Sequence, residues 1–313
     1  MNTAMSTRAR HAGVRFAAHL AQRLLPLTPT PRSFSSATRR VSPPEVVDVP
    51  TRHGAVRCLI YWPHPDAPLA MTGADGPPVN LHLHGGAFIV RNPRQEEYIA
   101  HHIAAEAGAV VVLADYATAP QVRYPVAEQE CFDVALWVRG EAGHRGWDAA
   151  RMSVTGASAG AKLAINVCQQ AYRTGDVGFR AAALAFPVVD LSRADRTSAK
   201  PRPRISRRIQ RLVIDSYLVD TSRSREPLAS PRFDDELTAA MPPTLTLTGA
   251  LDTLGPEGDE LAARLSDAGV PTTHHCFEGI DHGFTRSEAA SAHDATKRIA
   301  GHLVQHLRVN SVD

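Results

Sequence analysis

The chain has 313 residues, of which 43% are hydrophobic and 21% are charged, with glycine and proline spread along its length. This composition is typical of a folded, enzyme-sized protein and excludes the disordered, collagen-like and fibrous classes. A formal net charge of +2 excludes a strong field over the whole chain, so we do not expect nucleic acid as a partner.

Residues 1–44 contain no acidic side chain and are basic. Polar and apolar residues recur there at three- and four-residue steps on opposite sides, which predicts an amphipathic helix that ends at Pro26. The apolar side is Val14, Ala18, Ala21 and Leu25, and the polar side is His11, Arg15, His19, Gln22 and Arg23. Because the polar residues interrupt any apolar core, no secretory signal is expected, although the segment superficially resembles a transit peptide. Covering part of the fold and lying on a membrane surface both stay open as roles.

From Glu45 onward the chain changes to short strand-like runs. Runs at 46–50 and 56–62 flank a His53-Gly54 turn and predict an antiparallel hairpin. After a loop at 63–78, strands and helices alternate, which predicts an α/β fold with a doubly wound, mostly parallel sheet. Further strands are expected at 79–83, 109–114, 152–155, 182–186, 244–248 and 272–277, and helices at 95–107, 127–139, 159–172, 257–268 and 288–307.

Residues 190–241 break this alternation, because about 50 residues separate two strands where a crossover needs far fewer. We interpret them as a helical cap inserted into a catalytic domain that consists of 45–189 and 242–313, with 1–44 as part of the cap. Between residues 193 and 211 of the insert, Asp195 is the one acidic residue beside eight basic residues, which are Arg193, Arg196, Lys200, Arg202, Arg204, Arg207, Arg208 and Arg211. A solvated face, a funnel for acidic substrates and attachment to anionic lipid remain alternatives.

A G-x-S-x-G motif places Ser158 between Gly156 and Gly160, where a predicted strand meets a predicted helix. A serine on such a tight turn has a strained backbone, and its hydroxyl projects from the carboxyl edge of the sheet. The flanking glycines permit close packing of strand and helix. The helix N-terminus favours negative charge beside the serine. Ser158 is therefore the predicted nucleophile.

An H-G-G motif, His84-Gly85-Gly86, follows the strand predicted at 79–83. The backbone N–H groups of Gly85, Gly86 and Ala159 are predicted to converge on the oxyanion that forms during acyl transfer. His84 is expected to brace this loop by hydrogen bonding rather than to transfer protons. A phosphate-binding loop is the competing interpretation, but the loop lacks the G-x-x-x-x-G-K-[ST] and G-x-G-x-x-G patterns.

A serine nucleophile needs a base, and in this type of fold the acid and the histidine follow the serine along the chain. Asp252 and His282 each follow a predicted strand, so both belong to the sheet edge that carries Ser158. We predict that Asp252 orients the imidazole and that His282 takes the proton of Ser158. Asp281 and Asp259 are weaker candidates, because Asp281 adjoins the histidine and Asp259 falls inside the next helix.

Together these motifs resemble the hormone-sensitive lipase family of esterases and acetyl hydrolases, within the α/β-hydrolase fold. The resemblance covers about residues 78–308 and includes Ala87-Phe88, Asp115-Tyr116-Ala117-Thr118-Ala119-Pro120, Tyr124-Pro125, Gly146-Trp147-Asp148, Ser230-Pro231 and Gly283-Phe284. Ala157 replaces the family's Asp before the nucleophile, which removes a carboxylate that helps to fix nearby backbone, and Ala161 replaces a Gly. The resemblance implies that the N-terminal helix and the insert cover Ser158 and shape the acyl pocket.

The expected function is a serine carboxylesterase that hydrolyses short-chain acyl or acetyl esters through an acyl-enzyme, without a metal or other cofactor. Amide or N-acetyl hydrolysis by the same triad is one alternative. A ligand receptor on this fold is another, although such receptors generally lose a triad member, and here all three residues are present. The expected partner is a small-molecule ester; membrane contact through residues 1–44 and a homodimer stay open.

Cysteines and histidines give no sign of a metal centre. Four widely spaced cysteines without a C-x-x-C pair favour a reducing, cytoplasmic compartment. His101-His102 and His274-His275 are expected to be surface or helix residues rather than metal ligands. No apolar run reaches the roughly 20 residues of a membrane-spanning helix.

Overall fold

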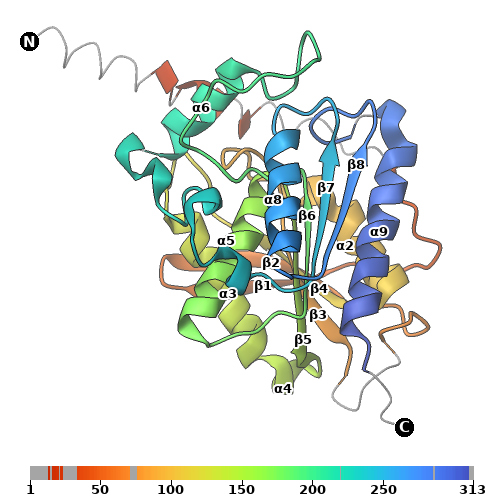
Figure 1. Ribbon diagram of the computed structural model, residues 1–313. Coiled ribbons are helices and arrows are strands. Elements are labelled where there is room, and N and C mark those ends of the chain that lie inside the picture. The colour runs from red at the N-terminus through yellow and green to blue at the C-terminus, as the bar shows by residue number, and fades with distance from the viewer. Residues whose placement is uncertain are drawn as a thin grey trace, which may run out of the picture.

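The computed structural model describes residues 13–14, 16–20, 22–23, 34–70, 76–218, 220–284 and 286–309, and within them eight strands form one sheet (Figure 1). The strands are β1 (Glu45–Thr51), β2 (Gly54–Tyr61), β3 (Pro78–Leu83), β4 (Val110–Asp115), β5 (Asp148–Ala157), β6 (Ala181–Ala185), β7 (Thr244–Gly249) and β8 (Thr272–Phe277). Their order is β1-β2-β4-β3-β5-β6-β7-β8, with β2 antiparallel to β1 and β4 and all other neighbours parallel. The predicted hairpin, the parallel sheet and the α/β class are confirmed.

Helices connect the parallel strands, and each helix predicted from the alternation is present. They are η3 (Pro93–Glu96), α2 (Glu97–His102), η4 (Ile103–Ala107), α3 (Val126–Gly140), α4 (Ala142–Arg145), α5 (Ala159–Thr174), α6 (Arg207–Tyr217), η5 (Thr221–Arg225), η6 (Pro231–Phe233), α7 (Leu237–Ala240), α8 (Gly255–Asp267), η7 (Arg286–Glu288) and α9 (Ala289–Leu307). The helix predicted at 95–107 is three consecutive segments, a 3-10 turn, an α-helix and a π-helical turn. Of the helices in the described residues, none combines the length and apolar character that crossing a membrane requires.

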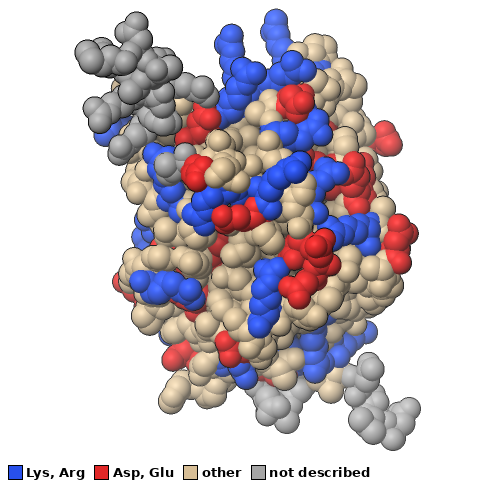
Figure 2. Space-filling view, turned by 60° about the vertical axis from the view of Figure 1, so that its left-hand side comes forward, with Lys and Arg blue, Asp and Glu red and all other residues tan. Residues whose placement is uncertain are grey.

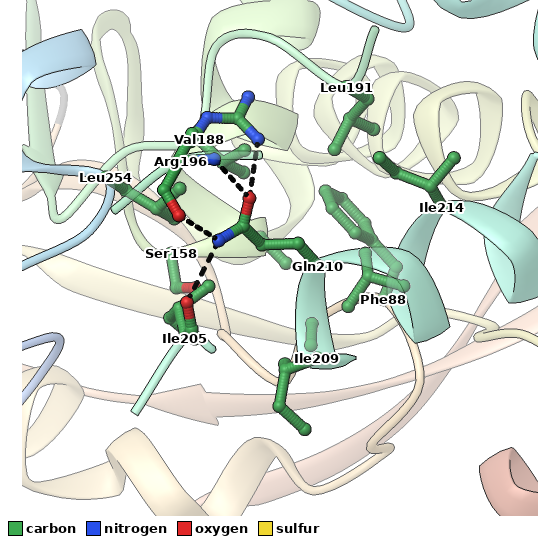
Figure 3. A pocket seen from close by; sticks show the side chains of 13 residues that line it. Phe88, Ser158, Val188, Leu191, Arg196, Ile205, Ile209, Gln210, Ile214 and Leu254 are labelled. Carbon is green, nitrogen blue, oxygen red and sulfur yellow. Dashed lines mark hydrogen bonds between the residues drawn. The ribbon is translucent and has the colours of Figure 1, made fainter. Parts of the chain in front are cut away.

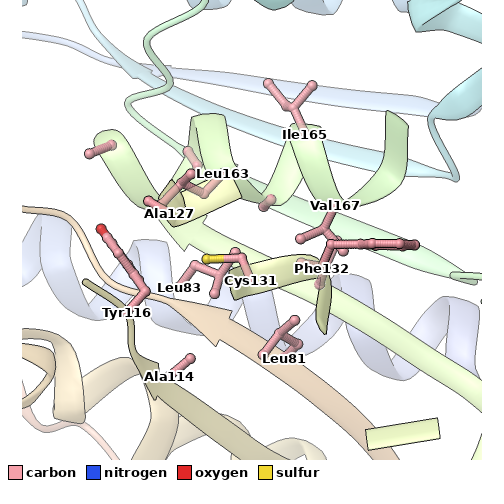
Figure 4. Packing of buried hydrophobic residues seen from close by; sticks show 14 of the residues in the cluster. Leu81, Leu83, Ala114, Tyr116, Ala127, Cys131, Phe132, Leu163, Ile165 and Val167 are labelled. Atoms are coloured by element: carbon pink, nitrogen blue, oxygen red, sulfur yellow. The ribbon is translucent and has the colours of Figure 1, made fainter. Parts of the chain in front are cut away.

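The sheet is buried on both faces, which explains why its central strands are almost continuously apolar. Along β4, Val110 and Val112 pack in the cluster with α3, α5 and α8, whereas Val111 and Leu113 pack with α2 and α9. Figure 4 shows where α3 and α5 meet β3, through Cys131, Phe132, Leu163, Val167, Leu81 and Leu83. Two helical layers thus fix β3 and β5, the strands that lead into the two predicted catalytic loops.

The described residues of the N-terminal segment, 13–14, 16–20 and 22–23, are helical. Ala18 is fully buried in the core, and the Gln22 amide donates hydrogen bonds to Ile89 O and Ala119 O, both at 2.8 Å. This helix therefore rests on the loop that follows the H-G-G motif. Predictions for Arg15, Ala21, Leu25 and the prolines concern positions outside the described residues.

The insert between β6 and β7 contains helices, as expected of a helical cap, and α6 is one of them. Ile209, Val213 and Ile214 turn one side of α6 inward, while its arginines, Arg207, Arg208 and Arg211, are exposed. The Ser206 hydroxyl accepts a hydrogen bond from Ile209 N and caps the helix. Figure 2 shows basic side chains projecting from the top of the molecule, where α6 lies in Figure 1. The boundaries of the cap stay a prediction.

Candidate active site

Ser158 lies on the sharp turn between β5 and α5, with φ 54° and ψ −117°. The backbone of a residue other than glycine is strained at positive φ. Here the turn is stabilised by the hydrogen bond that Ser158 N donates to Ala185 O at 2.8 Å. A Cβ atom on Gly160 would overlap with Leu83 O and His84 O, and one on Gly156 would overlap with the Gly160 carbonyl. The two glycines are therefore required for close packing, as the motif predicts.

The structure brings together the three residues predicted as a triad. His282 Nε2 lies 2.7 Å from Ser158 Oγ, and His282 Nδ1 lies 2.8 Å from Asp252 Oδ2. Asp252 is buried, and its other oxygen accepts a hydrogen bond from Leu254 N at 2.9 Å. A carboxylate at Nδ1 favours the tautomer with its proton there, which leaves Nε2 free to accept the hydroxyl proton.

The two weaker acid candidates face away from the imidazole. Asp281 accepts hydrogen bonds from the amides of His282 and Arg204 and pairs with Lys200 Nζ at 3.1 Å. Burial alone would raise the pKa of Asp281, but these three partners lower it below its ordinary value. Asp259 lies within α8, as predicted. Asp281 thus acts as an anchor for the histidine loop.

The insert holds this histidine loop in place. Arg204 Nη1 donates to His282 O at 2.8 Å, in addition to the contacts that Arg204 and Lys200 make with Asp281. From the same insert, Ser198 Oγ donates to Leu251 O at 2.5 Å, next to the predicted acid. Residues of the insert therefore contact both the loop that carries Asp252 and the loop that carries His282.

The H-G-G loop differs from the prediction at Gly85. Its N–H donates to Glu96 Oε1 at 3.0 Å, so this amide is already used by the protein and does not serve as the predicted oxyanion donor. No described residue accepts a hydrogen bond from the amides of Gly86, Ala87 or Ala159. Ala87 lies beside Ser158 in both cavities of the site, and it was missed because glycines alone marked the loop.

His84 contacts the loop backbone rather than Ser158. Its Nδ1 donates to Gly85 O at 2.6 Å, and its ring stacks on Tyr116 at 4.4 Å between centroids. The Tyr116 hydroxyl donates to His84 O at 2.5 Å. Burial lowers the pKa of His84, which keeps the ring neutral. These contacts suit a residue that braces the loop.

Two cavities of different size adjoin Ser158. The smaller, about 40 Å³, is shown in Figure 3 and is lined mainly by apolar residues of the loop and the insert, with Arg196 and Gln210 bonded to each other at its side. The larger, about 660 Å³, contains His282, Phe284 and Glu96. Of the two cavities, as lined by the described residues, only the larger one is lined by His282, the predicted base.

The paired histidines lie apart from this site. His101 and His102 belong to α2, where His102 is buried and its Nδ1 lies 3.2 Å from Ser36 Oγ. His274 and His275 are partly exposed on the edge strand β8. The described residues contain no group of three or more metal-ligating side chains arranged to hold an ion.

Comparisons with known proteins agree with this architecture. A family model described as the alpha/beta hydrolase fold matches residues 80–286. An arylesterase of Saccharolobus solfataricus is 29% identical over 67% of this chain and 69% of its own length, and an ethyl acetate hydrolase of Pseudomonas putida is 27% identical over 79% and 78%. The solved structure of a hyperthermophilic esterase from Pyrobaculum calidifontis has a TM-score of 0.79 at 24% identity and covers 93% of this chain and 91% of that one. The chain belongs to the α/β-hydrolase fold family, in the hormone-sensitive lipase-like group that its motifs resemble.

Proposed function

We propose that the protein is a serine carboxylesterase that hydrolyses short-chain acyl or acetyl esters through an acyl-enzyme. The observation that carries the proposal is the continuous chain of contacts from Asp252 through His282 to Ser158 Oγ. The arylesterase and the ethyl acetate hydrolase among its relatives support carboxylic ester hydrolysis as the reaction class.

We assign each group a role that is consistent with this geometry. His282 Nε2 takes the proton as Ser158 Oγ attacks the ester carbonyl, and Asp252 stabilises the imidazolium that results. The free amides of Gly86, Ala87 and Ala159 receive the oxyanion, at the N-terminus of α5. His282 then protonates the departing alcohol, and a water molecule activated by the same imidazole releases the acid.

The two cavities suggest how an ester is oriented, with its alcohol part in one cavity and its acyl part in the other. The leaving alcohol must lie next to the imidazole that protonates it, and His282 lines the larger cavity. The acyl chain is therefore assigned to the smaller, apolar cavity, whose volume is about 40 Å³. A cavity of this size suits an acetyl or a similarly short acyl chain, whereas the alcohol can be bulky.

Shortening a side chain in the smaller cavity should lengthen the preferred acyl chain. We expect Val213→Ala or Ile214→Ala to raise kcat/KM for p-nitrophenyl hexanoate relative to acetate by about 10-fold, the usual effect of roughly one methylene in an apolar pocket, since both residues line only the smaller cavity. Ile99→Ala is the matched control, because Ile99 lines only the larger cavity. An unchanged ratio in the Val213 and Ile214 variants would place the acyl chain elsewhere.

Covalent labelling tests the proposed reaction. A fluorophosphonate probe is expected to add one group per chain, located at Ser158 by peptide mass analysis, and to abolish hydrolysis of p-nitrophenyl acetate and butyrate in parallel. An adduct on another serine, or no hydrolysis of either ester, would contradict the proposal. Faster cleavage of p-nitroacetanilide than of the esters would instead favour amide hydrolysis by the same triad.

A further inference from the structure

Two consecutive side chains of η3 grip both polar atoms of Gly85. Glu96 Oε1 accepts a hydrogen bond from Gly85 N at 3.0 Å, and Gln95 Nε2 donates one to Gly85 O at 2.7 Å. We call Gln95 and Glu96 the Gly85 clamp. Because a carboxylate acceptor makes a stronger hydrogen bond than a neutral one, Glu96 is the firmer half.

The clamp lies within the catalytic cavity. Gln95, Glu96, Gly85 and Ser158 all line the larger cavity. A Cβ atom built on Gly85 would be 2.8 Å from Glu96 Oε1 and 3.4 Å from Ser158 Cβ, so the carboxylate and the nucleophile flank the same glycine.

The loop after Gly85 needs such support. Gly86, Ala87 and Phe88 have φ values of 128°, 55° and 58°, and two of these three residues carry side chains. Consecutive positive φ values are strained and persist only where surrounding contacts hold them. A Cβ atom on Gly86 would also approach Val90 O to 2.5 Å, so this position requires glycine.

A buried polar ladder extends behind Glu96. His82 Nδ1 lies 2.8 Å from Thr155 Oγ1, which donates to Asn80 Oδ1 at 2.9 Å. His82 Nε2 lies 3.4 Å from Glu96 Oε2, without a hydrogen bond between these two atoms. His82 and Asn80 belong to β3, which leads into the H-G-G loop, and Thr155 belongs to β5, which leads into Ser158. The ladder thus joins the two strands whose ends must be in register for catalysis.

We propose that Glu96, assisted by Gln95, is a positioning residue for ester hydrolysis. Glu96 fixes the peptide between His84 and Gly85, and Gln95 fixes the peptide between Gly85 and Gly86. The amides of Gly86 and Ala87 then point at the oxyanion that forms on the acyl group of Ser158. This role rests on the proposed function, since it concerns the same reaction. It also explains why a carboxylate lies in an ester-binding cavity without taking part in proton transfer.

Two substitutions at one position separate the acceptor from the side-chain volume. Glu96→Leu removes the acceptor, and we expect kcat for p-nitrophenyl butyrate to fall about 10- to 100-fold with little change in KM, because a misplacement of about 1 Å can cost about 10²-fold. Glu96→Gln keeps an oxygen that can accept from Gly85 N, and it should retain most of the wild-type kcat. Glu97→Leu is the matched control, since Glu97 accepts from the Tyr61 hydroxyl and lies outside both cavities.

A transition-state analogue provides the second measurement. A trifluoromethyl ketone adds to the serine and forms an oxyanion, so its Ki in Glu96→Leu should rise by the factor by which kcat/KM falls. A merely structural role would lower the amount of folded enzyme but would leave the Ki of the folded fraction unchanged. Gln95→Leu, which removes the other half of the clamp, should show a smaller loss in kcat of the same kind.

Wild type and Ser158→Ala are assayed beside these variants. If the wild type is active and folded Glu96→Leu has the same kcat and Ki as the wild type, the role of the clamp is rejected and the proposed function stands. If Glu96→Leu does not fold, Gln95→Leu decides, and an unchanged kcat and Ki in that variant overturn the clamp. A wild type without Ser158-dependent hydrolysis overturns the proposed function and the clamp with it.

Discussion

Replacing Ser158 by alanine is expected to lower kcat for p-nitrophenyl butyrate by a factor on the order of 10⁶, as loss of a triad serine does elsewhere. The alanine has no nucleophile to form the acyl-enzyme, although the oxyanion donors and both cavities remain. Initial rates at saturating ester, measured on protein with a wild-type circular dichroism spectrum, give the comparison.

The members of a triad act as a unit, which provides an internal check. Ser158→Ala combined with His282→Ala should be no slower than Ser158→Ala alone, because neither residue works without the other. Ser222→Ala, at an exposed serine in η5, is the control and should keep the wild-type rate. The triad is rejected if Ser158→Ala hydrolyses the ester as fast as wild type.

Replacing Glu128 by leucine is expected to lower the free energy of unfolding by about 3–5 kcal/mol, the usual cost of leaving one partner of a buried ion pair alone. Lys162 of α5 is fully buried, forms an ion pair with Glu128 of α3, and lies 3.3 Å from the Tyr217 hydroxyl of α6. Urea unfolding of the two proteins at neutral pH measures the difference.

The destabilisation should depend on pH in a definite direction. Burial lowers the pKa of Lys162, and Glu128 opposes this by favouring the charged form. Without Glu128 the folded-state pKa of Lys162 falls further below the unfolded value of about 10.4, so the unfolded chain binds more protons. The stability of Glu128→Leu should therefore rise with pH through the alkaline range, relative to wild type.

A double variant shows whether the lost pairing is the cause. Glu128→Leu with Lys162→Met should recover a part of the stability, because apolar residues of similar volume replace the buried pair at little or no cost. The rest stays lost, since the buried Tyr217 hydroxyl donates to Glu128 and has no such acceptor in the double variant. Asp294→Leu is the control for a partly exposed pair, the one with Arg298, and should cost about 0.2–1 kcal/mol. A double variant as unstable as Glu128→Leu would mean that packing, rather than the unpaired charge, determines the loss.

Much of the fold could be predicted because its signals are local. Each central strand is an apolar run bounded by turn residues, and strands that share a direction place Ser158, Asp252 and His282 at one edge. The triad could therefore be predicted from chain order and strand ends, without any knowledge of distances.

Other parts could not be predicted, because they depend on side-chain directions across distant segments. The Glu96 carboxylate reaches Gly85 only because the 3-10 turn of η3 aims it at the loop, and helix periodicity does not show that turn. The Lys162–Glu128 pair requires α5 and α3 to face each other with one charge each. In α6 the three arginines favoured a solvated surface and obscured the apolar residues at positions 209, 213 and 214.

Hydrogen bonds and an ion pair join the insert to the loops that carry Asp252 and His282, so the insert helps to position these two side chains. Ser198 holds the chain beside Asp252, and Lys200 with Arg204 holds the chain around His282. A chimaera in which a relative's insert replaced this one, made in order to change specificity, would also lose the contacts that position Asp252 and His282. Substrate range and turnover are therefore expected to change together, unless the new insert keeps the residues of this chain at positions 198, 200 and 204.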